Sequence, residues 1–143
     1  MKGSVDPMAL QLLFTEDRAW HVKTVIEPAL RAGTIVVCDR YWPSTIVYAE
    51  AQGLDSQELK KLNTKFLQPD CMIFTLPPLH VCLERLGRRM ERDIFERADL
   101  QKKIHAGYRA MAAANSQIRT VDTSGEKDEN AEEIWTCVKP FLA

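Results

Sequence analysis

Residues 35–41 read Ile35-Val36-Val37-Cys38-Asp39-Arg40-Tyr41, an apolar run followed at once by a charged pair. An unbroken apolar run of this length is typical of a strand that is covered on both faces, as in a parallel sheet. Charged residues directly after such a strand lie at its carboxyl end, where open α/β sheets bind their ligands. The stretch therefore predicts a strand over Thr34–Cys38 and a ligand site immediately after it.

Two more apolar runs extend this pattern along the chain. They predict further strands over Cys71–Leu76 and Ile118–Val121. The segments between the runs have apolar residues at helical spacing. Strands that alternate with helices are connected by right-handed crossovers, so we expect an α/β fold with a three-layer, mainly parallel sheet.

The ends of the predicted helices are marked by proline, aspartate and glycine. The first helix begins at Asp6-Pro7 and ends at Gly33, and its stripe includes Leu10, Leu13, Phe14, Val22, Val25, Ile26 and Leu30. Pro28 should kink its last turns or separate a short final piece. Further helices are expected from Pro43 to Gly53, from Asp55 through Phe66, over Leu79–Leu86, over Glu96–Ala114, and finally around Ile134, Val138 and Leu142.

Length and composition limit the class of protein. The chain has 143 residues, of which 45% are hydrophobic and 27% charged, and this predicts one globular domain over residues 1–143. Its net charge of −1 argues against a general electrostatic grip on nucleic acid. No apolar stretch approaches the ~18 residues of a membrane span, and no signal peptide is recognisable. The four cysteines form no CxxC pair, so we expect reduced thiols and a cytoplasmic location.

Two groups of residues could bind a nucleotide. Phe14 and Arg18 are one helical turn apart, and an aromatic plane beside a guanidinium suits a base next to a phosphate. Spacing alone favours the simpler interpretation, a core phenylalanine near a solvated arginine. Asp39 could hold a magnesium-bound water and Arg40 could bind phosphate oxygens. The alternative, a turn aspartate and a surface arginine, has equal weight.

An arginine-rich segment follows the predicted helix over Leu79–Leu86. Residues Gly87–Asp93 have no apolar periodicity, and the neighbourhood contains Arg85, Arg88, Arg89 and Arg92. Several guanidiniums on one loop can close over a polyphosphate and neutralise its charge. A solvated charged loop is the alternative, and it is the usual role of such a run.

Taken together, these motifs resemble the thymidylate kinase family over essentially the whole chain. They are Leu12–Arg18, Ile35–Tyr41 with Ser44, Thr45 and Tyr48, Pro69–Asp70 with the strand ending at Pro77–Pro78, Leu83–Arg85, Asp93–Glu96 and Val121–Asp122. The resemblance implies a P-loop-kinase-like fold and the reaction of ATP with dTMP to give ADP and dTDP, in dTTP biosynthesis. It also implies Mg²⁺ as cofactor and a homodimer, for which the first helix carries enough apolar surface.

The resemblance also assigns roles to individual residues. Phe14 would stack on thymine, Arg18 would reach the base and the monophosphate, and Arg40 would grip the nucleotide phosphate. Asp39 would support the magnesium site through water. Thr45 would lie near the thymine edge and Tyr48 beneath the sugar. Arg88, Arg89 and Arg92 would belong to a phosphate-closing lid at about residues 87–95.

The chain departs from the family pattern in three places. It contains no GxxxxGK[ST] phosphate loop, so we expect a fragment or an N-terminally truncated form that is inactive alone. Ile94 stands where an arginine is usual, and Ala49 where a glutamine often reads thymine. A kinase for another nucleotide therefore stays open. So does a catalytically inactive nucleotide-binding or dimerising module of kinase ancestry.

Overall fold

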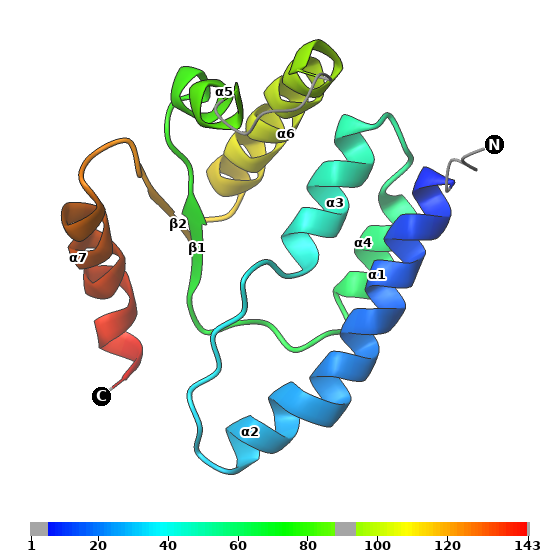
Figure 1. The fold of residues 1–143 in the computed structure, drawn as a ribbon. Helices are drawn as coiled ribbons and strands as arrows, with labels where there is room; N and C mark the ends of the chain where they lie inside the picture. Colours follow the sequence, from blue (N-terminus) through cyan, green and yellow to red (C-terminus); the bar gives the residue numbers. More distant parts are fainter. Residues whose placement is uncertain (1–5, 88–93, 143) are drawn as a thin grey trace. The chain divides into compact units, whose positions relative to one another are not determined.

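The computed structural model describes residues 6–87 and 94–142 (Figure 1). The chain divides into two compact units, Met1–Gln68 and Pro69–Ala143. Helices make up most of both units, and the second also contains a small parallel sheet. The predicted α/β class is therefore confirmed, while the prediction of one domain over residues 1–143 stays a prediction.

The first unit opens with helix α1, Pro7–His21, which starts where the sequence predicts. Asp6 caps it by accepting a hydrogen bond from the Ala9 amide at 3.1 Å. The chain continues as a π-helical turn, Val22–Ile26, and then as helix α2, Glu27–Arg31. Pro28 has no N–H to donate to the carbonyl four residues earlier, so the α-helical hydrogen bonding is interrupted before it and begins again as α2. The predicted interruption is confirmed.

The buried side of α1 differs from the predicted apolar stripe. α1 itself buries Gln11 and Thr15, whereas Leu13 and Phe14 of the predicted stripe are exposed. Beyond α1, the stripe residues Val22 and Ile26 are buried in the π-helical turn, as predicted, while Val25 and Leu30 are exposed. The reason is that α1 packs against helices α3 and α4, which present hydrogen-bonding partners as well as apolar side chains. Apolar spacing located the helix correctly but not the face that it buries.

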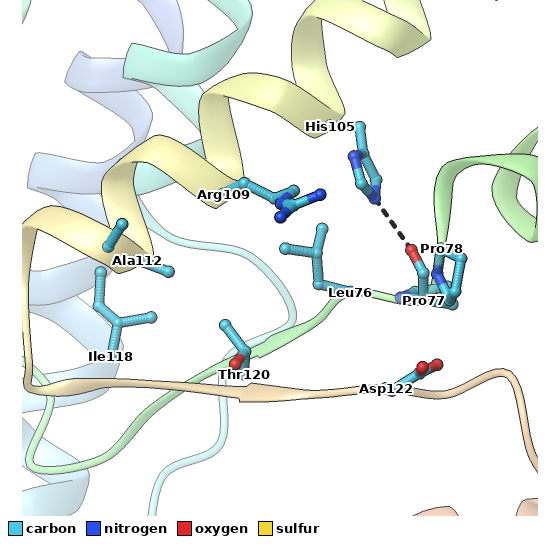
Figure 2. A pocket seen from close by; sticks show the side chains of 10 residues that line it. Leu76, Pro77, Pro78, His105, Arg109, Ala112, Ile118, Thr120 and Asp122 are labelled. Carbon is cyan, nitrogen blue, oxygen red and sulfur yellow. Dashed lines mark hydrogen bonds between the residues drawn. The ribbon is translucent and has the colours of Figure 1, made fainter.

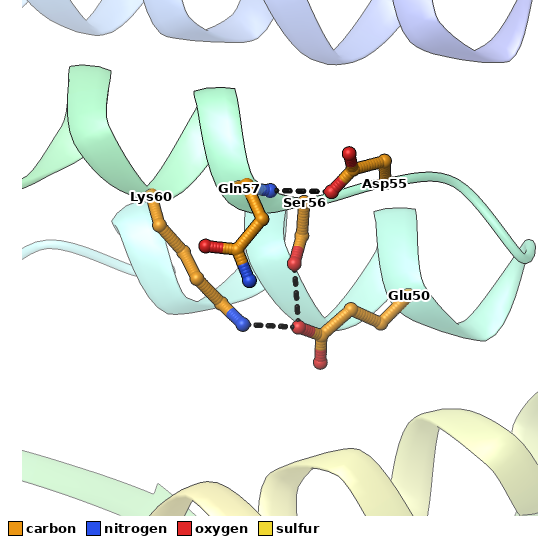
Figure 3. A network of polar contacts seen from close by, with 5 residues as sticks. All are labelled: Glu50, Asp55, Ser56, Gln57 and Lys60. Carbon is orange, nitrogen blue, oxygen red and sulfur yellow. Dashed lines mark hydrogen bonds and ion pairs between the residues drawn. The ribbon is translucent and has the colours of Figure 1, made fainter.

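Helices α3, Trp42–Ala51, and α4, Gln57–Asn63, complete the first unit and confirm two further predictions. Gly53, with φ +78°, ends α3, and the Leu54 amide bonds back to the Ala49 carbonyl. Figure 3 shows how the connection is fixed: the Glu50 carboxylate accepts hydrogen bonds from the Ser56 hydroxyl and the Lys60 ammonium, each at 2.6 Å.

The second unit is built around strands β1, Met72–Thr75, and β2, Ile118–Val121. The strands pair in parallel, with Met72 opposite Ile118 and Thr75 opposite Val121. Helix α5, Leu79–Gly87, and helix α6, Ile94–Ala114, connect them, and α7, Lys127–Val138, follows with a final 3₁₀ turn. The rings of Phe74 and Tyr108 meet edge to face at 5.0 Å, joining the sheet to α6. These predicted strands and helices are confirmed.

The predicted strand Thr34–Cys38 is wrong, because within the described residues this segment forms no strand. Ile35 and Val37 are 67% and 90% exposed. A strand exists only when a neighbour satisfies its backbone groups, and the sheet seen in the described ranges holds β1 and β2 alone. Cys38 is exposed as well, and all four cysteines are free thiols, as predicted. Among the helices described, none has the length and apolar character needed to cross a membrane.

Candidate functional site

The side chain of Arg18 is the centre of the candidate site in the first unit. Its Nη1 donates to the Asn63 Oδ1 at 2.6 Å, and its Nη2 donates to the Thr45 Oγ1 at 3.0 Å. Asn63 is 1% exposed and Thr45 is 3% exposed. The guanidinium is therefore held by two buried acceptors, one on α4 and one on α3.

Two aromatic rings lie beside the same guanidinium. The Arg18 Cζ is 5.3 Å from the Tyr41 ring centroid and 6.0 Å from that of Phe66. Contacts of this kind stabilise a cation whose hydration has been reduced. The Tyr41 hydroxyl donates to the Leu67 carbonyl at 3.1 Å, and burial raises the pKa of this phenol, so it stays protonated at neutral pH.

The side-chain hydrogen bonds of Arg18 are made to neutral acceptors and not to a carboxylate. Burial lowers the pKa of its guanidinium, while Tyr41 and Asp17 act in the opposite direction. An arginine nevertheless stays charged at neutral pH. In the part of the chain that the structure describes, no carboxylate forms an ion pair with it. A half-buried cation with neutral acceptors favours binding of an anionic ligand.

Arg40 and Tyr48 form a second pair on the same unit. The Arg40 Nη1 donates to the Tyr48 hydroxyl at 3.2 Å, and its Cζ lies 5.5 Å from the ring centroid. The backbone of Arg40 is left-handed, with φ +67°. Non-glycine residues rarely adopt this conformation, and when they do they often belong to functional sites.

The other residues singled out from the sequence are Phe14, Asp39, Ala49 and the lid arginines. Phe14 lies one turn before Arg18 on α1 and is 47% exposed, so its ring is open to a ligand. Asp39 is exposed at the end of the apolar segment. Ala49 is fully buried, so no side chain at that position reads a base. The lid residues Arg88, Arg89 and Arg92 lie outside the described residues.

The sequence did not indicate that Asn63 and Phe66 belong to the site, or that the Tyr41 ring lies beside Arg18. Asn63 had a signal in the sequence, because it lies four residues after Leu59, at a position where the helix pattern expects an apolar core residue. A polar residue at a core position needs a buried partner. The sequence did not indicate that this partner would be an arginine on another helix.

The donors available for a metal ion are few. Of the described residues, no group of three or more His, Cys, Asp or Glu side chains is arranged to hold one. Mg²⁺ usually keeps several waters and takes only one or two carboxylates together with substrate phosphates. The exposed carboxylate of Asp39 fits that mode of binding and does not fit an all-protein metal cage.

Open pockets are also present among the described residues of the second unit. One, of about 490 Å³, lies between α6 and the sheet and is lined by His105, Arg109, Thr120 and Asp122 among others (Figure 2). The His105 ring points toward Pro77, another lining residue, and its Nε2 lies 2.9 Å from the Pro77 carbonyl. The other, of about 410 Å³, is lined in part by Arg85, which donates to the Thr123 carbonyl at 2.6 Å.

Comparison with known proteins gives a consistent result. The family model described as Thymidylate kinase matches residues 1–134. The thymidylate kinase of Synechococcus sp. (strain JA-3-3Ab) is 37% identical over 143 residues, covering 95% of this chain and 69% of that protein. The probable thymidylate kinase of Sulfolobus acidocaldarius is 33% identical over 141 residues, covering 98% of this chain and 71% of that protein.

Proposed function

The chain belongs to the thymidylate kinase family, and from this premise we propose that its first unit binds dTMP as the acceptor of a phosphoryl group. One observation carries the proposal. Arg18 is a half-buried cation between Asn63, Thr45 and two aromatic rings, and no carboxylate among the described residues forms an ion pair with it. An anionic nucleotide supplies the missing negative charge.

The surrounding side chains suit the rest of the nucleotide. The exposed ring of Phe14 would stack on the thymine, and Thr45 would lie at its edge. Tyr48 would lie beneath the sugar. Arg40, held against Tyr48, would grip the phosphate with charge-assisted hydrogen bonds. Because Ala49 is buried, thymine specificity must come from these other residues.

We propose the family reaction, in which the γ-phosphoryl group of ATP passes to dTMP and gives ADP and dTDP. Such transfer depends on in-line positioning and on neutralising the charge of the phosphates. Arg40 would position the acceptor phosphate, and Arg88, Arg89 and Arg92 would close over the donor as a lid. Mg²⁺, when bound, neutralises phosphate charge, and Asp39 would hold it through water.

The phosphate loop is the part of this machinery that residues 1–143 do not contain, since they include no GxxxxGK[ST] sequence. We propose that these 143 residues alone transfer little or no phosphate. The lid arginines neutralise charge but do not fix the β- and γ-phosphates as loop amides and a lysine do. The same observation favours a second candidate function, a nucleotide-binding or dimerising module without transfer.

A coupled assay of ADP release separates the two functions. Residues 1–143 alone should be inactive. The same chain extended by a segment carrying a strand, a phosphate loop and a helix should form dTDP, as part of a three-layer P-loop-kinase sheet. Activity of the unextended chain that depends on Arg40 and Asp39 would contradict the proposed need for the loop. An extended chain that binds dTMP but stays inactive would favour the second candidate.

Binding of dTMP is tested directly by calorimetry. Arg18→Met should weaken binding strongly, because it removes the cation at the centre of the site. Arg31→Met is a matched control, since Arg31 belongs to the same unit but lies on the surface and forms an exposed ion pair with Glu27 at 3.4 Å. Equal affinity in Arg18→Met and Arg31→Met would show that dTMP does not bind at Arg18.

A further inference from the structure

Asn63 is the most buried polar residue of the site, and both ends of its amide have partners. Its Oδ1 accepts from the Arg18 Nη1 at 2.6 Å. Its Nδ2 donates to the Leu59 carbonyl at 2.7 Å and to the Thr15 Oγ1 at 3.3 Å. Thr15 in turn donates its hydroxyl hydrogen to the Gln11 carbonyl at 2.9 Å, so its oxygen is left to accept from Asn63.

These contacts fix which way the amide points. The reversed amide would place its oxygen against the Leu59 carbonyl and its NH₂ group against the Arg18 cation, and both arrangements are repulsive. The acceptor is therefore aimed at Arg18 by groups that do not themselves contact Arg18. Because all of them are buried, a mispaired amide could not turn to water for compensation.

The neutrality of this acceptor matters as much as its direction. A carboxylate in the same place would also accept from Arg18, but it would cancel the cation and compete with an anionic ligand. An amide oxygen holds the guanidinium in place and leaves its charge available. Thr45, the other acceptor, is neutral too.

We propose that Asn63 is a positioning residue that orients Arg18 for the nucleotide while preserving its positive charge, with Thr15 orienting Asn63. The proposal rests on the proposed function, because it gives Arg18 the role of contacting dTMP. It goes beyond that function by assigning affinity and charge selectivity to a residue that does not touch the ligand.

The first test does not require a ligand. In the ¹⁵N-labelled chain, an immobilised Arg18 should give separate Nη signals, assigned by their absence in Arg18→Lys. Asn63→Ala should merge or broaden them. The matched control is Ser56→Ala, which also removes a buried side-chain hydrogen bond from the first unit but lies in the Glu50 network, away from Arg18. Unchanged Nη signals in Asn63→Ala would overturn the proposal.

The second test compares dTMP with thymidine, which lacks the phosphate charge. Asn63→Ala should bind dTMP about tenfold more weakly or worse, the loss expected when a hydrogen bond to a charged group is removed. Asn63→Asp should weaken dTMP binding more than thymidine binding, because the added carboxylate neutralises Arg18. A purely structural role of Asn63 would weaken the binding of both ligands equally, and that result would overturn the proposal. Ser56→Ala is again the control for a general loss of stability.

The outcomes also separate this proposal from the proposed function. If the wild-type chain binds no dTMP, or Arg18→Met binds it normally, the proposed function fails, and the Nη signals still decide whether Asn63 orients Arg18. If Arg18→Met loses dTMP while Asn63→Ala and Asn63→Asp keep full affinity, the proposed function stands and the role of Asn63 is refuted.

Discussion

Arg40 allows the backbone and the side chain of one site residue to be tested separately. Its φ of +67° is left-handed, and its guanidinium contacts the hydroxyl and the ring of Tyr48. Arg40→Ala and Arg40→Gly remove the same side-chain contacts. They differ only in whether the residue tolerates a left-handed backbone, so comparing them isolates the conformational cost.

The size of each effect follows from the structure. A left-handed conformation costs a non-glycine residue roughly 1–2 kcal/mol. Glycine avoids this cost, but its greater freedom in the unfolded chain lowers the stability of the glycine variant by about 0.4–1 kcal/mol. Arg40→Gly should therefore be more stable than Arg40→Ala by about 1 kcal/mol. Both variants would lose the proposed charge-assisted phosphate contact, worth about 1.5–3 kcal/mol, so both should bind dTMP about 10- to 150-fold more weakly.

Urea denaturation measures the free energy of unfolding of the two variants, and calorimetry measures their dTMP affinity. If Arg40→Ala is as stable as Arg40→Gly, the residue is not held in a left-handed conformation and the argument from strain is wrong. If both variants bind dTMP like the wild-type chain, the phosphate lies elsewhere. Equal affinity in the two variants is the internal control, because the missing side chain is the same.

Three further predictions concern other residues of the first unit. Phe14→Ala should weaken dTMP binding by calorimetry with little change in the urea midpoint, because the ring is 47% exposed and packs little; normal affinity would exclude stacking on thymine. Hydrogen bonds from Lys60 and Ser56 lower the pKa of Glu50, so its carboxylate stabilises the fold at neutral pH, and this contribution is lost as the pH falls through the depressed folded-state pKa. Glu50→Gln should therefore be less stable than wild type at pH 7 in urea titrations, by less than about 1 kcal/mol. This deficit should begin to shrink as the pH falls through the ordinary glutamate pKa of about 4.3 and disappear below the depressed folded-state pKa; a deficit that persists in stronger acid would exclude the charge as its cause. Trp20 is 63% exposed on α1, so if this face joins two copies in the expected homodimer, Trp20→Lys should give monomers in sedimentation analysis, and an unchanged dimer would place the interface elsewhere.

The features predicted correctly from the sequence depend on local chemistry. Asp6 and Pro7 start a helix through a cap and a fixed φ, and Gly33 and Gly53 end helices because each takes a left-handed φ. Pro28 interrupts a helix because it lacks a donor. None of these effects depends on what the rest of the chain does, so the sequence alone was sufficient.

The burial of α1 and the surroundings of Arg18 depend on contacts between helices, and they were predicted less well. Counting apolar residues favoured a face containing Leu13 and Phe14, whereas the face with Gln11 and Thr15 is buried. A polar face can be buried when partners satisfy it, and Asn63 lies 45 residues from Arg18 along the chain. Single-sequence periodicity has no means of pairing positions so far apart.

The apolar segment Thr34–Cys38 shows the same limit in the sheet. Its composition matches a strand covered on both faces, yet Ile35 and Val37 are largely exposed. Burying such side chains stabilises a fold by about 25 cal/mol per Å² of apolar surface, but only a partner strand with satisfied backbone bonds makes that burial available. β1 and β2 meet this condition because they pair with each other. An apolar run therefore indicates how much stability pairing would contribute, while the partner has to be found in the structure.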